Sequence, residues 1–358
     1  MSDKAVKVFG AFRQVFVAAK DLPSNAEIHV PIPKFDYNTL FHLVEITASI
    51  LVKQQNVVQV EPPVYVIGDI KGNVIDLVRI LTKTESFTNH RFIFLGNYFD
   101  NFMVSEDIVA LLTSIIILFP HNVYLLRSNT DIALNNSRGM DPNLFEGIRN
   151  MLSLCPLGAI VKNRFYCSAD GVPIDQPLIS HLLEIERPNN DIMPTFGYQE
   201  DFAKIMSFFQ KNNIKKVIRG GEVVPKGIEK GADGHIIMIF SCTNYQHKRN
   251  RGGFVFISAE GECKGYNIPV TSSSKSNKPA HPSAGLEPGQ VVRDKKIVFK
   301  MNFTGPLPKA KKGASALKPR KIGSMALIGD HGRRRSIQGM PKSSVYDQIS
   351  NINPDDVR

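Results

Sequence analysis

Three stretches between residues 64 and 131 determine the expected fold of this chain. Residues 64–73 read VYVIGDIKGN, residues 91–101 read RFIFLGNYFDN, and residues 122–131 read NVYLLRSNTD. Each begins with an apolar run rich in β-branched and aromatic residues and continues into Gly or Ser and a polar cluster, as a buried strand does where it enters a loop. Because α/β folds place their ligands at the carboxyl ends of strands, we expect these polar clusters to converge.

The segments around these strands predict an α/β fold. Residues 74–81 and 105–118 have apolar positions at helical spacing, and Ser105, Glu106 and Asp107 suit the start of the second helix. This alternation predicts a mostly parallel sheet flanked by helices. A helix at residues 142–155 follows. Residues 158–258 then contain short strands with Gly-rich turns and one helix at 198–211, which together predict a second sheet.

The chain is expected to have three parts. We predict a helical N-terminal region at residues 1–60, with helices at 6–19 and 39–51, a folded body at 61–270, and a basic tail at 271–358. The tail contains 17 Lys and Arg but 6 Asp and Glu, which accounts for the whole net charge of +11. It is rich in Ser, Lys, Pro and Gly and poor in aromatic residues, so it is predicted to be disordered.

The apolar runs and the cysteines of the sequence indicate the cellular compartment of the protein and whether it contacts a membrane. The longest apolar run, residues 108–119, is shorter than the ~18 residues that a membrane span needs, and it predicts a buried helix. The N-terminus lacks the pattern of a signal peptide. None of the four cysteines, Cys155, Cys167, Cys242 and Cys263, has C-x-x-C spacing. We therefore expect reduced thiols in an intracellular protein, cytoplasmic or nuclear, without membrane contact.

The strand-end blocks resemble the signature blocks of the phosphoprotein phosphatase family of serine/threonine phosphatases. The family blocks read G-D-x-H-G, G-D-x-V-D-R-G and G-N-H-E, and they correspond here to residues 68–72, 96–102 and 128–131. Residues 167–171 resemble C-x-H-G-G, residues 217–221 an apolar run with R-G/A-H, and residues 240–245 F-S-A-P-N-Y. The similarity covers residues 40–270 and is greatest to the protein phosphatase 1 type. It implies a calcineurin-like metallophosphoesterase fold, a β-sandwich flanked by helices.

The resemblance also implies a metal site, which this sequence has largely lost. In the family, two divalent ions (Mn, Fe or Zn) are held by two Asp, one Asn and three His, and they activate water. Two ligand positions are retained, Asp69 and Asn129. The other four are substituted: Lys71, Ala169 and Gly221 replace the three His, and Asn97 replaces the bridging Asp. Imidazoles are the preferred ligands of such ions and none remains, so we predict no metal cofactor.

The groups that act on the phosphate in the family are also changed. The catalytic acid His corresponds to Thr130, and the phosphate-binding Arg of the second block corresponds to Asn101. The block with the other phosphate-binding Arg is missing, and the chain resumes at Thr195-Phe196-Gly197-Tyr198. The remnants of the catalytic set are Asp100, Asp131 and Tyr245.

Lys71 has two interpretations. An ammonium group cannot coordinate a metal, so Lys71 could replace the lost ions as a fixed positive charge facing Asp69 and Asp100. Buried carboxylates without an opposite charge are costly, which favours such a pairing. The alternative is that Lys71 points to solvent from a loop.

Two short motifs in the tail suggest regulation. Residues 296–299 resemble the R/K-V/I-x-F motif with which regulators dock on protein phosphatase 1, with Lys296, Ile297 and Phe299 as the matching positions. Docking could be on another phosphatase or on the equivalent groove of this chain. Such a short motif also arises by chance, or its apolar residues could pack on the body. Ser336 follows three arginines and is a candidate phosphorylation site, or this run is simply solvated. The basic tail permits weak, unspecific contact with nucleic acid.

Two classes of function remain. One is a catalytically inactive pseudophosphatase that binds proteins, either phosphatase regulators or a protein phosphatase 1 type catalytic subunit. The alternative is a phosphoprotein phosphatase with residual or altered metal-dependent activity on a rebuilt site. The number of lost ligands favours the first.

Overall fold

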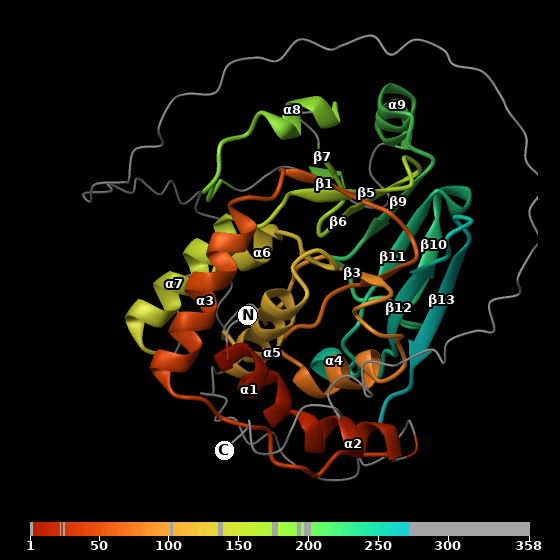
Figure 1. Cartoon of the computed structure of the whole chain (residues 1–358). Coiled ribbons are helices and arrows are strands. Elements are labelled where there is room, and N and C mark those ends of the chain that lie inside the picture. The colour runs from red at the N-terminus through yellow and green to blue at the C-terminus, as the bar shows by residue number, and fades with distance from the viewer. Residues whose placement is uncertain are drawn as a thin grey trace, which may run out of the picture. The chain divides into compact units, whose positions relative to one another are not determined.

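The computed structural model of the chain (Figure 1) describes residues 3–21, 23, 26–100, 103–134, 139–173, 178–191, 195–196 and 202–271. Its helices are α1 (Asp3–Ala11), α2 (Arg13–Asp21), α3 (Tyr37–Leu51), α4 (Val74–Leu81), α5 (Glu106–Leu118), α6 (Asn129–Ile132), α7 (Pro142–Ser153), α8 (Ile179–Leu183) and α9 (Phe202–Asn212), with the short 3-10 helices η1 (Ala232–Gly234) and η2 (Tyr245–His247). The predicted tail, with Lys296, Ile297, Phe299 and Ser336, lies outside the described residues from position 272 onward.

The strands form two mixed sheets and one short ribbon. The six-stranded sheet has the order β1 (Val57–Val60), β5 (Gly158–Val161), β6 (Phe165–Ser168), β9 (Lys216–Arg219), β11 (Ile236–Ile239), β10 (Ile228–Gly231). The five-stranded sheet has the order β13 (Cys263–Ile268), β12 (Gly252–Ile257), β2 (Val64–Ile67), β3 (Arg91–Phe94), β4 (Val123–Leu125). The ribbon pairs β7 (Val172–Pro173) with β8 (Thr195–Phe196). Strands β2, β3 and β4 run parallel, as predicted.

The two sheets pack face to face, and alternation along each strand explains how. In β2, Val64 and Val66 belong to the core that also contains Ile237 of β11, so they lie between the sheets. Tyr65 belongs to the core shared with helices α1, α3 and α5. Because side chains alternate across a strand, a strand covered on both faces must be apolar throughout, as the run VYVI is.

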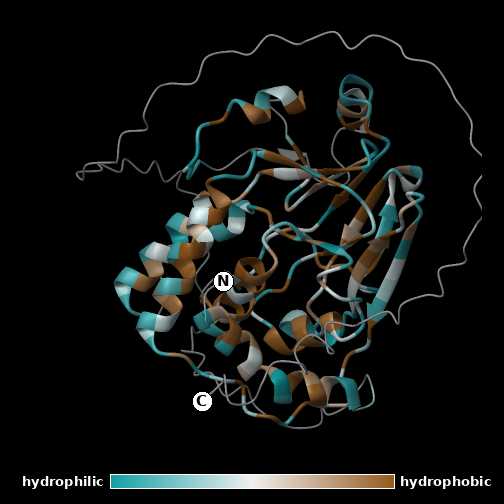
Figure 2. Cartoon of the chain, viewed as in Figure 1, coloured by the Kyte–Doolittle hydropathy of each residue, from teal (hydrophilic) through white to brown (hydrophobic). Residues whose placement is uncertain are grey.

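Helices cover the outer face of each sheet. Helices α1, α3, α4, α5 and α7 share one apolar core with the five-stranded sheet, whereas α8 and α9 pack on the other sheet. The helices at the periphery in Figure 2, such as α3 and α7, show brown and teal faces, as expected for helices with one buried side. Helix α5 is buried along residues 108–117, which confirms the burial predicted for this apolar run. The predicted helix-flanked sandwich is therefore confirmed.

The N-terminal region differs in part from its prediction. The predicted helix at residues 6–19 is two helices, α1 and α2, separated at Phe12, whose side chain is buried in the helical core. The helical assignment of residues 1–60 is wrong at its end, because Val57–Val60 form strand β1 and pair in parallel with β5. Ser105 lies at the N-cap of α5, but its side chain makes no capping hydrogen bond.

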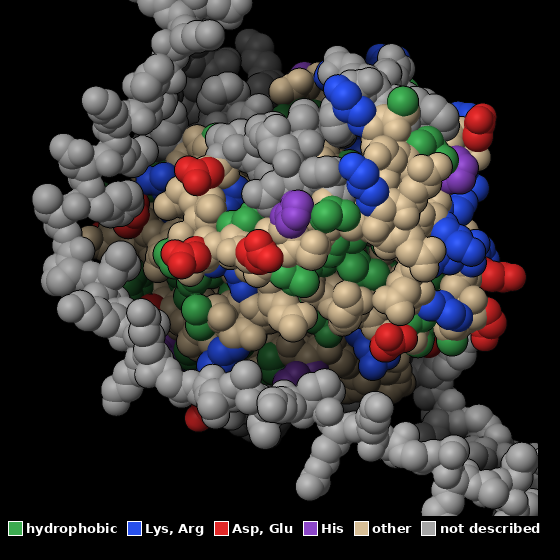
Figure 3. All heavy atoms as spheres, turned by 90° about the horizontal axis from the view of Figure 1, so that it is seen from above, with side chains coloured by type: hydrophobic (Ala, Val, Ile, Leu, Met, Phe, Trp, Pro, Cys, Tyr) green, Lys and Arg blue, Asp and Glu red, His purple; other side chains and the backbone are tan. Residues whose placement is uncertain are grey.

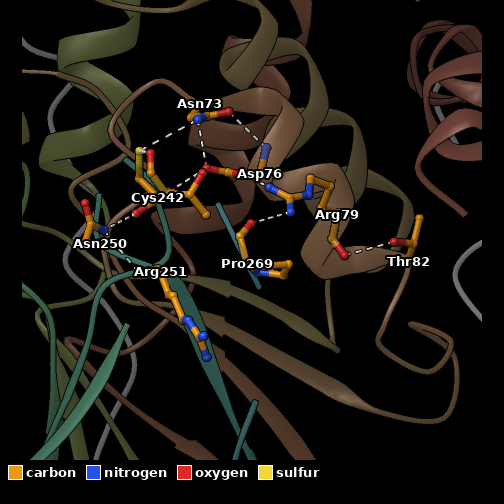
Figure 4. A network of polar contacts seen from close by, with 9 residues as sticks. Asn73, Asp76, Arg79, Thr82, Cys242, Asn250, Arg251 and Pro269 are labelled. Carbon is orange, nitrogen blue, oxygen red and sulfur yellow. Dashed lines mark hydrogen bonds and ion pairs between the residues drawn. The ribbon is translucent and has the colours of Figure 1, made fainter. Parts of the chain in front are cut away.

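A buried polar network joins α4 to the segment that follows β13 (Figure 4). Arg79 Nη1 lies 2.7 Å from Asp76 Oδ1, and Arg79 Nη2 donates to the Pro269 carbonyl at 2.6 Å. Asp76 also accepts hydrogen bonds from the Thr243 N–H and from Asn73 Nδ2. Burial raises the pKa of Asp76, and the hydrogen bond from Thr243 together with the Arg79 charge opposes the rise. The network joins the crossover helix to the loop after β11 and to the residue after β13.

Within the described ranges, no helix is long and apolar enough to cross a membrane.

Candidate functional site

The candidate site lies where strands from both sheets end. Asp69 follows β2, Asn97 follows β3, and Asn129 follows β4, because these parallel strands direct their carboxyl ends to one edge. Asp170 follows β6 and Gly221 follows β9 of the other sheet. The two sheets are joined here through Asp69, whose carbonyl oxygen accepts hydrogen bonds from the N–H groups of residues 241 and 242 after β11. The convergence predicted from the three polar clusters is therefore present.

Asp69 is the centre of the site, and its carboxylate is fully buried. Oδ1 accepts hydrogen bonds from the Gly221 N–H at 2.9 Å and from Asn97 Nδ2 at 3.3 Å. Oδ2 forms an ion pair with Lys71 Nζ at 3.3 Å. Burial raises the pKa of Asp69 to about 6, and the Lys71 charge and the Gly221 N–H act against this rise. Gly220 is required beside it, since a Cβ there would lie 2.2 Å from Oδ1.

Lys71 lies inside the site and does not point to solvent. Its side chain is 9% exposed, and Nζ also donates to Asn97 Oδ1 at 3.2 Å. The amide of Asn97 is thus oriented by two partners, with its nitrogen toward Asp69 and its oxygen toward Lys71. The expected pairing of Lys71 with Asp69 is present. Asp100 accepts a hydrogen bond from the Tyr245 hydroxyl at 2.8 Å, which brings these two remnants together.

The hydrogen-bond partners of Asp131 give this residue a structural role. Its carboxylate is buried and accepts hydrogen bonds from the Ser128 hydroxyl at 2.6 Å and from the N–H groups of Tyr98 and Phe99 at 3.3 and 3.4 Å. It therefore holds the loop after β3 against the start of α6. Burial raises its pKa to about 6, opposed chiefly by the Ser128 hydrogen bond. Thr130, which the resemblance aligns with the catalytic acid, lies in α6, and Asn101 is outside the described residues.

Sequence reasoning missed Asp170 as a member of the site. Its carboxylate accepts a hydrogen bond from the Asn129 N–H at 2.7 Å. Burial raises its pKa, while this N–H and the charges of Arg219 and Lys71 oppose the rise. Arg219, from the end of β9, is buried and forms an ion pair with Glu222 at 2.7 Å. The signal was an Asp placed where the block C-x-H-G-G has Gly, directly after a predicted strand.

These residues do not fit a pair of divalent metals. Within the part of the chain that the structure describes, no group of three or more His, Cys, Asp or Glu side chains is placed to hold an ion. The Lys71 ammonium is paired with Asp69, and the Gly221 N–H donates to the same carboxylate. Beside Ala169 and Asp170 there is a pocket of about 20 Å³, room for about one water molecule. Neither Ala169 nor Gly221 has a side chain that could coordinate.

Comparisons with known proteins agree with this architecture. Residues 62–225 match the calcineurin-like phosphoesterase family model. The chain is 23% identical over 265 residues to the serine/threonine-protein phosphatase 4 catalytic subunit of Kluyveromyces lactis, covering 65% of this chain and 86% of that protein. It is 24% identical over 272 residues to serine/threonine-protein phosphatase BSL2 of Arabidopsis thaliana, covering 62% of this chain but 26% of that much longer protein.

A solved structure shows the same fold. It is a protein serine/threonine phosphatase from Saccharomyces cerevisiae with similarity to human phosphatase PP5, and it superposes with a TM-score of 0.59 at 17% identity. The superposition covers 67% of this chain and 92% of the yeast chain. Residues 62–225 are therefore similar to the calcineurin-like phosphoesterases, and the chain shares its fold with a solved serine/threonine phosphatase.

Proposed function

We propose that this protein is a pseudophosphatase: a phosphatase-like protein without metal-dependent hydrolytic activity that acts by binding other proteins. The observation that carries the proposal is the ion pair between Lys71 Nζ and the buried Asp69 carboxylate. A fixed ammonium neutralises this carboxylate in place of a metal ion. It supplies no Lewis acid and no bound water for attack on a phosphate.

The electrostatics of the site also oppose phosphate binding. The carboxylates of Asp69, Asp170 and Asp100 lie at this edge of the sheets, and two cations beside them, Lys71 and Arg219, are already paired with Asp69 and Glu222. A phosphate monoester carries up to two negative charges at neutral pH. We infer that phosphorylated client proteins, if bound, are not held in this site, so the rebuilt centre stabilises the fold.

The partners that fit this role are proteins of phosphatase signalling. We include phosphatase regulators, for which this domain would compete with an active relative, and a protein phosphatase 1 type catalytic subunit bound through residues 296–299. Ser336 would then be a regulatory phosphorylation site in the same tail as the docking segment, since a phosphate there changes the charge of a basic stretch. The relatives named above are protein phosphatases, and an intracellular location is proposed with this role.

Metal content and hydrolysis test the proposal together. The purified full-length protein should contain no stoichiometric manganese, iron or zinc after dialysis, and it should hydrolyse no aryl phosphate with or without added manganese. An active serine/threonine phosphatase purified in the same way is the positive control. Two equivalents of metal that survive dialysis would contradict the proposal, and turnover that is lost in the Asp69→Asn variant would establish residual phosphoesterase activity.

A further inference from the structure

The loop between β11 and β12 has an unusual charge. Residues 240–257 contain no Asp or Glu, and residues 245–251, which we call the basic loop, read YQHKRNR. Lys248, Arg249 and Arg251 are all exposed. No ion pair within the described part of the chain involves any of the three. Like charges held close together repel each other, so this loop presents a surface that an anionic partner would stabilise.

The basic loop is held in one conformation by the buried side chain of Asn250. Its Oδ1 accepts a hydrogen bond from the Tyr245 N–H at 2.9 Å. Its Nδ2 donates to the Cys242 carbonyl at 2.8 Å, as Figure 4 shows. The end of the loop is joined to the segment before β10 by the Arg251 N–H, which donates a hydrogen bond to the Pro225 carbonyl at 2.9 Å. In Figure 4 the Arg251 side chain extends away from the network around Asp76. The cations are therefore attached to a rigid support.

The loop also contains backbone strain. Four residues that are not glycine, Asn244, Gln246, His247 and Arg249, have φ values of 48°, 49°, 61° and 55°. Such left-handed conformations are unfavourable for residues with a Cβ and persist only where the surrounding structure enforces them, often in ligand-binding segments. A partner that binds this loop loses little free energy to ordering it, because the loop is ordered already.

The position of the basic loop relative to the candidate site determines which surface of the loop an acidic ligand can reach. The Tyr245 hydroxyl bonds to Asp100, so the start of the basic loop closes over the rebuilt centre. The carboxylates of that centre would repel an acidic ligand. Exposed Lys226 lies next to Pro225 and adds a further cation beside the loop. An acidic ligand is thus excluded from the centre and attracted to the outer surface of the loop.

We propose that the basic loop, with Lys226, docks an Asp- and Glu-rich segment of a partner protein. The N–H groups of residues 244, 245, 247, 248, 249 and 251 all donate within the protein, so no row of free N–H groups remains there to surround one phosphate. Binding must come from side chains, and spread guanidinium and ammonium groups suit separate carboxylates.

Nucleic acid is a weaker match for the same surface. Long-range attraction to a polyanion requires an extended stripe of positive charge. Residues 1–270 are neutral, since the whole +11 lies in residues 271–358. On the face shown in Figure 3, Lys and Arg side chains gather toward the side where β10–β13 lie, but Asp and Glu side chains are among them. A compact cationic loop amid mixed charge fits a short acidic peptide better.

A local reporter tests the docking in the full-length protein, despite its basic tail. The chain has no tryptophan, so a Pro225→Trp variant carries a single indole next to the basic loop. Position 225 offers only its carbonyl to Arg251, and the substitution retains that carbonyl. The ligand is a ten-residue Asp- and Glu-rich peptide with a nitroxide, which quenches indole fluorescence only at short range. The same peptide with Asn and Gln is the uncharged control.

The test compares the Kd of the peptide for two triple variants. Both are made in the Pro225→Trp background, and each loses three positive charges. We expect saturable quenching whose Kd rises at least about fivefold in Lys248→Gln/Arg249→Gln/Arg251→Gln. The matched control is Lys4→Gln/Lys7→Gln/Lys53→Gln, which removes exposed charges elsewhere and should change the Kd less than about twofold. Unchanged melting temperatures would show that both variants fold.

Two results would overturn the proposal. One is equal quenching in both triple variants, which would mean that the basic loop contributes no more than general charge. The other is displacement of the peptide by a ten-nucleotide oligothymidine at lower concentration than by unlabelled peptide, which would identify a nucleic-acid surface. Neither result depends on whether the protein is catalytically active, so a failure here is distinct from a failure of the proposed function.

Discussion

Replacing Lys71 with Met tests the central electrostatic argument. The Lys71 side chain is 9% exposed, the Asp69 side chain is fully buried, and Nζ lies 3.3 Å from Oδ2. Removing one member of a buried ion pair typically costs about 3–5 kcal/mol, because the other charge is left without compensation. Asp69 keeps its bonds from the Gly221 N–H and Asn97, so we expect the lower end, about 3 kcal/mol. Met is similar in volume and meets the same positive φ of 50°.

The stability lost in Lys71→Met should depend on pH, and the pKa of Asp69 determines in which direction. Burial raises the pKa of Asp69 from 3.8 to about 6, so the folded state binds this proton more tightly than the unfolded chain. The stability that this carboxyl contributes is present below its unfolded pKa and lost as pH rises through 6. The Lys71 charge lowers the pKa of Asp69. Removing that charge therefore raises the pKa of Asp69 further and makes its ionisation in the folded state less favourable. The difference between variant and parent should therefore be largest above about pH 7 and shrink below about pH 5.

Urea unfolding followed by circular dichroism measures this free energy across pH. Lys53→Met, at an exposed position just after α3, is the matched control and should change stability by less than about 0.5 kcal/mol. A Lys71→Met protein that unfolds at the same urea concentration as the parent at pH 7 would show that the ammonium contributes nothing. A loss that is constant across pH would mean that Asp69 ionisation is not its cause.

Two further predictions concern other parts of the chain. Arg79→Met should destabilise the protein by about 3 kcal/mol or more in urea unfolding, because Asp76 would remain buried without its partner; a loss below about 1 kcal/mol would contradict this. Ile297→Ala with Phe299→Ala should weaken pull-down of a protein phosphatase 1 type catalytic subunit at least about a hundredfold, since each anchor contributes about 1.5–3 kcal/mol. Equal recovery of both forms that disappears at high salt would mean that only the basic charge binds.

Local patterns predicted the central elements well. Helix α4 begins and ends at the predicted residues 74 and 81, because its apolar spacing and the Asn73 cap are encoded within one short stretch. Strands β2, β3 and β4 are apolar on both faces and are followed by Gly or polar residues, so their type and ends were readable. The arrangement of two sheets came from the family resemblance, since strand order is not visible in periodicity.

The elements that were missed depend on distant partners. Strand β1 has four residues, and it is a strand because β5, about a hundred residues later, pairs with it. Strand β13 has a mostly exposed, polar sequence and is recognisable only beside β12. Asp170 was missed for the same reason, because its role depends on the Asn129 N–H from another strand end. Residues in contact across the sandwich leave no short-range signal.

Hydrogen bonds between backbone groups hold the strand ends together, so this fold does not depend on the side chains at the predicted ligand positions. The N–H groups of Ile70 and Lys71 donate to the Asn97 carbonyl at 3.2 and 3.0 Å, which joins the loops after β2 and β3 without any side chain. The Asp69 carbonyl binds the loop after β11 in the same way. The side chains at these positions therefore set the charge balance of the centre, whereas the backbone sets its frame. What such a centre still requires is a counter-charge for its most buried carboxylate, and Lys71 provides it.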